Sequence, residues 1–179
     1  MRLRAATSQD AAAISEIYAP YVSASNVSFE TEPPSAREMK VRIEAGRGLY
    51  PWLVLEDEAG GLAGYAYATT FRVRAAYRFT VETSVYLSPR HQGLGLGRRL
   101  YQALLTTLEA QGFTQAIAAI ALPNPPSVRL HEAVGFVAAG RYAKIGFKLG
   151  GWHDVGLWQR ALAPATNPPT EPRKLAELL

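Results

Sequence analysis

The chain has 179 residues, of which 48% are hydrophobic, and a net charge of +4. This length suits one domain that buries roughly 70% of the surface of its unfolded chain. Without cysteine the chain can form neither a disulfide nor a thiolate metal site, so a cytoplasmic protein is the simplest inference. No apolar run approaches the ~20 residues that span a bilayer, which argues against a membrane protein. The basic residues are scattered, and this favours an anionic small ligand over nucleic acid.

The first third of the chain predicts a strand and two helices. Residues 2–6 are expected to form a strand, followed by a helix that Thr7 or Ser8 caps and whose apolar side chains recur at helical spacing. Pro20 should kink or end this helix. After a turn region over residues 23–34, Ser35 is expected to cap a second helix that runs to about Ala45.

From residue 52 onward the pattern changes to that of a sheet. Residues 52–56 and 62–68 predict two strands of a hairpin, so the sheet is antiparallel here. The connection over residues 71–78 contains Arg72, Arg74 and Arg78. It is either a solvated loop or a clamp for an anion, because guanidinium groups pair bidentately with carboxylates and phosphates.

Residues 79–87 predict a strand with clean alternation, and Glu82 lies on its polar face. A carboxylate inside a sheet needs a partner or a function unless it faces solvent, and Arg72 or Arg74 could be an ion-pair partner. Three glycines at alternate positions follow, and then a leucine-rich helix that Gly112 ends.

The last third predicts a buried strand, a short helix and a second hairpin. Residues 116–122 are an unbroken apolar run, typical of a strand covered on both faces in the middle of a sheet. Two prolines stop this strand and begin a helix over residues 127–134. Residues 136–147 and 152–162 predict two further strands. We expect a single domain over residues 1–162 and a proline-rich tail over residues 163–179, lying on the surface or on a partner.

The glycine turn is suited to phosphate. The N-terminus of a helix presents unpaired N–H groups and the positive end of the helix dipole. A dinucleotide fingerprint requires G-x-G-x-x-G in the first strand–helix turn, and a P-loop requires lysine after its last glycine. Neither fits, because Gly93, Gly95 and Gly97 alternate in mid-chain and Arg98 follows them.

The pattern Q-x-x-G-x-G, formed by Gln92, Gly95 and Gly97, resembles the pyrophosphate-binding loop of acetyl-CoA-dependent N-acetyltransferases of the GNAT superfamily. Motifs within residues 80–92, 122–136 and 146–159 are similar to those of the phosphinothricin N-acetyltransferase family. The resemblance implies an α+β fold with a mixed, mostly antiparallel sheet that is splayed at the cofactor site and flanked by helices. It also implies a homodimer.

The implied reaction moves the acetyl group of acetyl-CoA to the α-amino group of phosphinothricin, methionine sulfoximine, methionine sulfone or a similar amino acid. Such a transfer needs a neutral nitrogen, a stabilised oxyanion and a protonated thiolate. The resemblance places Glu82 as the proton acceptor, directly or through a water, with Tyr86 as a further catalytic residue. His131 stands where many superfamily members carry a tyrosine, so it is either an acid for the thiolate or a structural histidine.

The remaining site residues fall into two groups. The implied cofactor-binding residues are Val85, Tyr86, Leu87, Gly93, Leu94, Gly95, Leu96, Gly97, Arg98, Asn124 and Ser127. The implied acceptor-binding residues are Phe29, Arg72, Arg74, Tyr77 and Tyr86. No metal is expected, because the three histidines are scattered.

Two other functions stay open at this point. One is acetylation of a different small molecule or of a protein N-terminus, and the other is a module that binds acyl-CoA without turnover. Glu82 and Tyr86 beside an intact glycine turn favour catalysis over the module.

Overall fold

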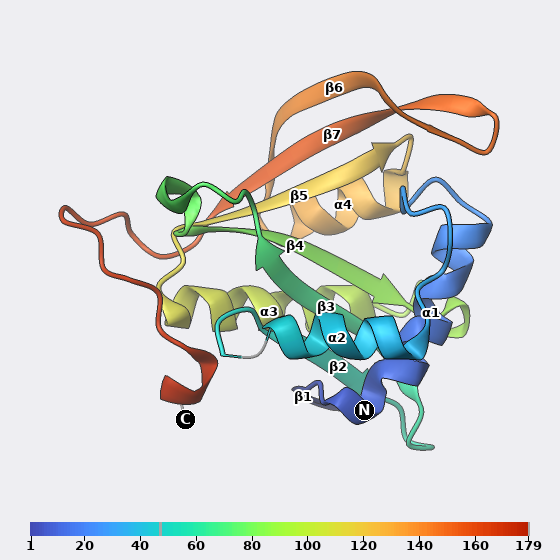
Figure 1. The fold of residues 1–179 in the computed structure, drawn as a ribbon, viewed down its shortest axis with the longest axis horizontal. Coiled ribbons are helices and arrows are strands. Elements are labelled where there is room, and N and C mark those ends of the chain that lie inside the picture. Colours follow the sequence, from blue (N-terminus) through green and yellow to red (C-terminus); the bar gives the residue numbers. More distant parts are fainter. Residues whose placement is uncertain (47, 179) are drawn as a thin grey trace.

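A computed structural model describes residues 1–46 and 48–178. Its centre is a seven-stranded sheet with the order β1-β2-β3-β4-β5-β7-β6 (Figure 1). All neighbouring strands are antiparallel except β4 and β5, which are parallel. This is the mixed, mostly antiparallel sheet that the sequence predicts. The strands are β1 (Arg2–Ala5), β2 (Trp52–Glu56), β3 (Leu62–Thr70), β4 (Thr80–Leu87), β5 (Gln115–Leu122), β6 (Val137–Lys148) and β7 (Gly151–Ala161).

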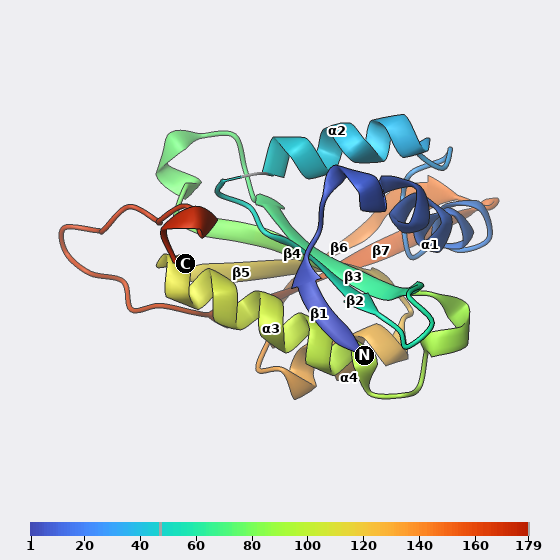
Figure 2. The ribbon, with the colours of Figure 1, turned by 90° about the horizontal axis from the view of Figure 1, so that it is seen from below.

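Helices cover both faces of the sheet. Figure 2 shows α1 (Ala11–Ser23) and α2 (Ala36–Gly46) on one face and α3 (Leu96–Gln111) and α4 (Pro125–Ala133) on the other. Each face has its own core. The apolar side of α3, led by Leu100, Leu104 and Leu108, packs on the middle strands. On the opposite face α1 and α2 pack over aromatic side chains of β2 and β3. β4 contacts both cores, since Val81 belongs to the first and Tyr86 packs against the second.

The two central strands part halfway along their length. The pairing of β4 with β5 covers only three positions and ends where Glu82 lies opposite Ile117. β4 stays paired with β3 as far as Leu87, so one edge of its second half faces a gap. The predicted splay in the sheet is thereby confirmed.

Three details differ from the sequence prediction. Of the two outcomes predicted at Pro20, a kink or the end of the helix, the structure contradicts the end, because α1 continues to Ser23. Pro20 costs one hydrogen bond, to the carbonyl of Glu16, and both residues are exposed, so water can satisfy that carbonyl. Helix α4 begins at Pro125, two residues earlier than predicted. β5 lies inside the sheet, but it is not covered on both faces, because Ala119 is exposed.

The tail after Ala161 lies on the chain's own surface. The backbone N–H of Arg173 donates to the carbonyl of Gln111, and that of Leu175 donates to the carbonyl of Gly48. Glu171 forms an ion pair with Arg78 at 2.7 Å. Leu179, the last residue of the predicted tail, lies outside the described residues. Across residues 1–46 and 48–178, the helices are too short or too polar to span a bilayer.

Candidate active site

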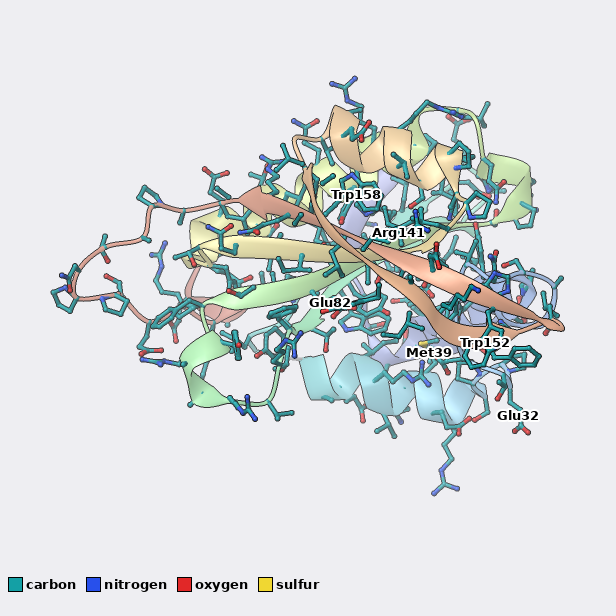
Figure 3. The ribbon with its side chains drawn as sticks, turned by 90° about the horizontal axis from the view of Figure 1, so that it is seen from above. Glu32, Met39, Glu82, Arg141, Trp152 and Trp158 are labelled. Carbon is teal, nitrogen blue, oxygen red and sulfur yellow. The ribbon has the colours of Figure 1, made fainter. Side chains whose placement is uncertain are left out.

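Glu82 occupies the point at which β4 and β5 separate. Figure 3 shows it on β4, over the middle of the sheet. The side chain is half-buried, and burial raises the pKa of its carboxyl, while the nearby charge of Arg72 lowers it in part. Among the described residues no basic nitrogen lies within ion-pair distance of this carboxyl. Glu82 is therefore a carboxylate without a structural partner.

An aromatic wall stands beside Glu82 on the same face of the sheet. The ring of Tyr86 lies between those of Tyr18, Tyr21 and Tyr65, with centroids 4.9, 5.1 and 5.4 Å away. Burial raises the pKa of the Tyr86 hydroxyl well above its usual value. The hydroxyl therefore carries its proton at neutral pH.

The second half of β4 directs backbone groups into the gap. Ser88 donates its N–H to the carbonyl of Ala63 on the β3 side. The backbone N–H groups of successive residues in a strand point to opposite sides. The N–H of Tyr86 therefore also points toward β3, whereas the N–H groups of Val85 and Leu87 point into the gap. These two amides are available to an extended ligand that lies between the strands.

Residues 93–97, here called the glycine loop, close one end of the gap. Gly93 and Gly95 have φ angles of 74° and 75°, a region that favours glycine. Gly95 also holds the N-cap position of α3, whose first turn has no side-chain cap. Gly97 packs against Leu87 and Leu130, where a Cβ would meet both at 3.4 Å. The loop therefore presents backbone N–H groups at a helix N-terminus, with the exposed Arg98 beside them.

A cavity of about 450 Å³ connects Tyr86 and the free amides of β4 with the glycine loop, and Glu82 lines neither this cavity nor the smaller one beside it. It contains most of the predicted cofactor residues, but Leu94 and Leu96 do not line it. The lining residues are Tyr21, Val27, Val85, Tyr86, Leu87, Gln92, Gly93, Gly95, Gly97, Arg98, Asn124, Pro126, Ser127, Arg129 and Leu130. A smaller cavity of about 40 Å³ adjoins it in the wedge between β4 and β5, and His131 lines that wedge.

The start of α4 forms the far wall of the gap. The side chain of Asn124 caps this helix by accepting a hydrogen bond from the N–H of Ser127 at 3.2 Å. His131 is 5% exposed, and its Nδ1 lies 2.7 Å from the carbonyl of Ser127. Because a carbonyl only accepts, Nδ1 carries the proton. Burial lowers the pKa of His131, so at neutral pH the ring is neutral and its Nε2 has no proton to donate.

The predicted acceptor residues lie in two separate places, and apart from Tyr86 they line neither cavity. Arg72 stacks its guanidinium on the rings of Phe71 and Tyr77, at 5.1 and 5.9 Å from their centroids. Arg74 is exposed and makes no side-chain hydrogen bond among those described. Phe29 packs over β6, where a Cβ at Gly146 would clash with its ring. Of this set, Arg72 is the residue whose charge acts on the Glu82 carboxyl, and Tyr86 shares β4 with it.

Tyr21 is the main lining residue that the sequence analysis missed. Its position on α1 suits the apolar stripe of that helix, so the sequence indicated only a core side chain. In the structure its hydroxyl donates to the carbonyl of Leu87 and accepts from the side chain of Gln92. Arg129 and Pro126, on α4, were missed as well, and no sequence signal distinguished them from surface residues.

Residues 3–157 match the family description "Acetyltransferase (GNAT) domain". The chain belongs to the GNAT acetyltransferase family. The family uses acetyl-CoA, and the cavity fits this co-substrate, since a gap with free strand amides leads to glycine backbone at a helix N-terminus. The protein is accordingly an acetyl-CoA-dependent N-acetyltransferase.

Individual members of this GNAT family resemble the chain over almost its whole length. A phosphinothricin N-acetyltransferase of Streptomyces viridochromogenes is 50% identical over 173 residues, covering 96% of this chain and 94% of the relative. An L-methionine sulfoximine/L-methionine sulfone acetyltransferase of Salmonella typhimurium is 36% identical, covering 90% and 95%. The crystal structure of a phosphinothricin acetyltransferase from Sinorhizobium meliloti in complex with acetyl-CoA has a TM-score of 0.89 and 43% identity, covering 95% and 93%.

Proposed function

We propose that this acetyltransferase acetylates the α-amino group of phosphinothricin, methionine sulfoximine, methionine sulfone or a similar amino acid. Two relatives support this class of acceptor: one is named for phosphinothricin, and the other is named for L-methionine sulfoximine and L-methionine sulfone. The observation that carries the proposal is the position of Glu82, a half-buried carboxylate without an ion-pair partner where the strands part beside the cofactor cavity.

Glu82 acts as the proton acceptor in this proposal. An amino-acid ammonium must lose a proton before its nitrogen can attack the thioester carbonyl. Burial raises the pKa of Glu82 and so makes its carboxylate a better base than an exposed one. The proton passes from the ammonium to Glu82, directly or through a water, and the nitrogen then forms a bond to the acetyl carbon.

The cofactor lies along the gap. The amides of Val85 and Leu87 bind the pantetheine arm as a strand would, and one of them donates to the developing oxyanion. The glycine loop, from Gly93 to Gly97 with Leu94, Gly95 and Leu96, binds the pyrophosphate through its backbone, and Arg98 adds positive charge. Asn124 and Ser127 support the cofactor from the start of α4.

The C–S bond of the tetrahedral intermediate breaks last, and the thiolate takes a proton to give free CoA. The nitrogen of the product gives its one excess proton to solvent, and solvent returns a proton to the group that protonated the thiolate. We assign the proton of the thiolate to the Tyr86 hydroxyl, which is protonated at neutral pH and lines both cavities. His131 fits this step less well, because its neutral tautomer carries the proton on the nitrogen that binds Ser127. We therefore give His131 the role of positioning the start of α4.

The acceptor binds on the Glu82 side of the aromatic wall. Arg72 is near enough to Glu82 to influence its pKa, and its guanidinium suits a carboxylate, phosphinate or sulfone oxygen. Tyr77 stacks on Arg72 and fixes its direction. Arg74 and Phe29 are exposed and line neither cavity, so in this proposal they contact only the solvent-facing side of the acceptor.

Steady-state assays of free thiol release, with acetyl-CoA and a panel of amino acids, test this function. We expect turnover with phosphinothricin and methionine sulfoximine, and a loss of about 10²- to 10⁴-fold in kcat for Glu82→Gln. Glu109→Gln removes an exposed glutamate of α3 and serves as the control with unchanged turnover. Turnover confined to peptides or other amines would replace the proposed acceptor, and silence with every amine would favour a non-catalytic acyl-CoA module.

We also propose that two copies associate through the β6–β7 hairpin. β6 is an edge strand, and apolar side chains project from it and from the adjoining turn and strand. The exposed apolar residues are Val137, Tyr142, Ile145, Phe147, Leu149 and Trp152. An open edge strand with a row of exposed apolar side chains favours association with another chain.

We further propose that the enzyme works in the cytoplasm, since its reaction consumes acetyl-CoA. Cell fractionation tests this location.

Residues 1–162 form the catalytic domain in this proposal, and residues 163–179 form a tail that stabilises the domain by packing on its surface. The buried side chain of Gln111 supports this role, because its Nε2 donates to the carbonyls of both Leu49 and Arg173. A chain that ends at Leu162 should melt at a lower temperature than the full chain while it keeps its turnover. Equal melting temperatures would show that the tail adds no stability.

A further inference from the structure

The hydroxyl of Tyr21 lies where three parts of the site meet. It donates to the carbonyl of Leu87 at 2.6 Å and accepts a hydrogen bond from Nε2 of Gln92 at 2.9 Å. Tyr21 belongs to α1, Leu87 is the last residue of β4, and Gln92 directly precedes the glycine loop. One hydroxyl thus ties α1 to the end of the strand and to the start of the loop.

The direction of these two hydrogen bonds is fixed. The carbonyl of Leu87 can only accept, so the Tyr21 proton points toward it, and the oxygen lone pair then receives the amide of Gln92. The same ring packs edge-on against Tyr86, with centroids 5.1 Å apart, and lines the cofactor cavity. Tyr21 therefore contacts both the strand end and the aromatic wall while it holds Gln92.

The part of the glycine loop that precedes α3 has few contacts of its own to hold its shape, whereas Leu96 and Gly97 already belong to the helix. Gly93 and Gly95 adopt positive φ angles, and nothing lies within 4 Å of a Cβ built on either one. The backbone N–H of Gln92 makes only a long contact of 3.4 Å, to the carbonyl of Pro89. Glycines have wide conformational freedom, so a loop of this kind must lose entropy when it binds a ligand unless something outside it restricts it.

We propose that Tyr21 is a positioning residue that holds the glycine loop, through Gln92, in the conformation that binds acetyl-CoA. The inference rests on the proposed cofactor role of this loop. Neither side chain needs to touch the reacting atoms, so the effect belongs to cofactor affinity and not to the chemical step.

Tyr18 provides a matched control one turn earlier on the same helix. Its ring also packs edge-on against Tyr86, at 4.9 Å, and its hydroxyl also makes two hydrogen bonds. Those bonds go to Ser28 and Glu30, away from the glycine loop. Tyr18→Phe and Tyr21→Phe thus remove the same group from the same aromatic cluster, but only Tyr21→Phe affects the loop.

The test measures the Kd of acetyl-CoA by titration calorimetry for the wild type, Tyr21→Phe, Gln92→Met, the double variant and Tyr18→Phe. We expect Tyr21→Phe and Gln92→Met each to raise this Kd about 2- to 10-fold, the effect of losing the hydrogen bond between Tyr21 and Gln92. Tyr21→Phe also loses the hydrogen bond to the carbonyl of Leu87. The Kd of the double variant should lie within about twofold of that of Tyr21→Phe, because both substitutions break the same hydrogen bond. The kcat at saturating acetyl-CoA and the acceptor KM should stay within about twofold of the wild type, and Tyr18→Phe should bind acetyl-CoA as the wild type does.

Several outcomes would overturn the inference. These are an unchanged Kd in Tyr21→Phe, strictly multiplicative effects in the double variant, or an equal loss in Tyr18→Phe. Gln92 is exposed, so Gln92→Met keeps the fold even if Tyr21→Phe lowers stability. A wild type that binds no acetyl-CoA would instead contradict the proposed cofactor site, which separates the two failures.

Discussion

Glu82 combines a functional requirement with a cost to the fold. Its carboxyl is removed from water without a basic partner, and its pKa in the folded chain is raised above that in the unfolded chain. The folded state then binds this proton more tightly, so stability falls as the pH rises from the unfolded pKa through the folded pKa. Ionised Glu82, the form that accepts a proton, is the form that the fold tolerates least.

Glu82→Gln should therefore separate stability from activity. At pH 8 the variant should melt at a higher temperature than the wild type, because the neutral amide avoids the burial of a charge. Near pH 4 the wild-type carboxyl is itself protonated and the difference should vanish. Melting curves at pH 4, 6 and 8 check this, and a gain of equal size at every pH would show that ionisation of Glu82 is not its cause.

The sequence can reveal Glu82 but not Tyr21, for a physical reason. Alternation along a strand is local, so a carboxylate on the polar face of residues 79–87 stands out without knowledge of its neighbours. The two partners of Tyr21 lie 66 and 71 residues away along the chain. Only the packing of α1 across the end of β4 brings them together. The periodic spacing of apolar residues in α1 does not reveal that contact.

At the scale of elements, the turn between β4 and α3 depends on glycine for two different reasons. Gly95 needs its positive φ, and its missing side chain leaves space where the pyrophosphate would approach. Gly95→Ala should cost about 1 kcal/mol of stability, the strain of a left-handed alanine. It should also raise the KM of acetyl-CoA, because the added methyl group faces the ligand.

Gly60→Ala is the matched control for this change. Gly60 has a φ of +84° and equally open surroundings, but it lies in the turn between β2 and β3. Denaturant melts should give the two variants similar losses of stability, whereas steady-state kinetics should show a higher acetyl-CoA KM only for Gly95→Ala. An unchanged KM in Gly95→Ala would mean that the cofactor does not approach this residue.

Element boundaries follow the sequence wherever the signal is local. The hairpin of β2 and β3 and the end of α3 at Gly112 were predicted from turn residues and a glycine cap, and the structure confirms them. The coverage of β5 was not predictable in this way. Its apolar run suggests helices on both faces, but the core beneath α1 and α2 contains no β5 residue, so Ala119 stays exposed.

At the scale of the whole molecule, the β6–β7 hairpin carries large apolar side chains that a single chain leaves exposed to water. Phe147 and Trp152 face each other across the strands with ring centroids 5.4 Å apart, yet they are 60% and 63% exposed. Figure 3 shows Trp152 toward the tip of this hairpin. Aromatic pairs on an open edge strand are costly to leave in water, and burial against a second copy would remove that cost.

The proposed dimer makes a prediction about mass in solution. Wild-type protein should elute at twice the chain mass in size-exclusion chromatography with light scattering, and Phe147→Glu should shift it to the monomer, since a charge cannot be buried there without a partner. Val41→Glu places the same charge at an apolar residue of α2 that is 61% exposed, and it should leave the dimer intact. A monomeric wild type, or a dimer that Phe147→Glu does not disturb, would assign the exposed hairpin to something other than self-association.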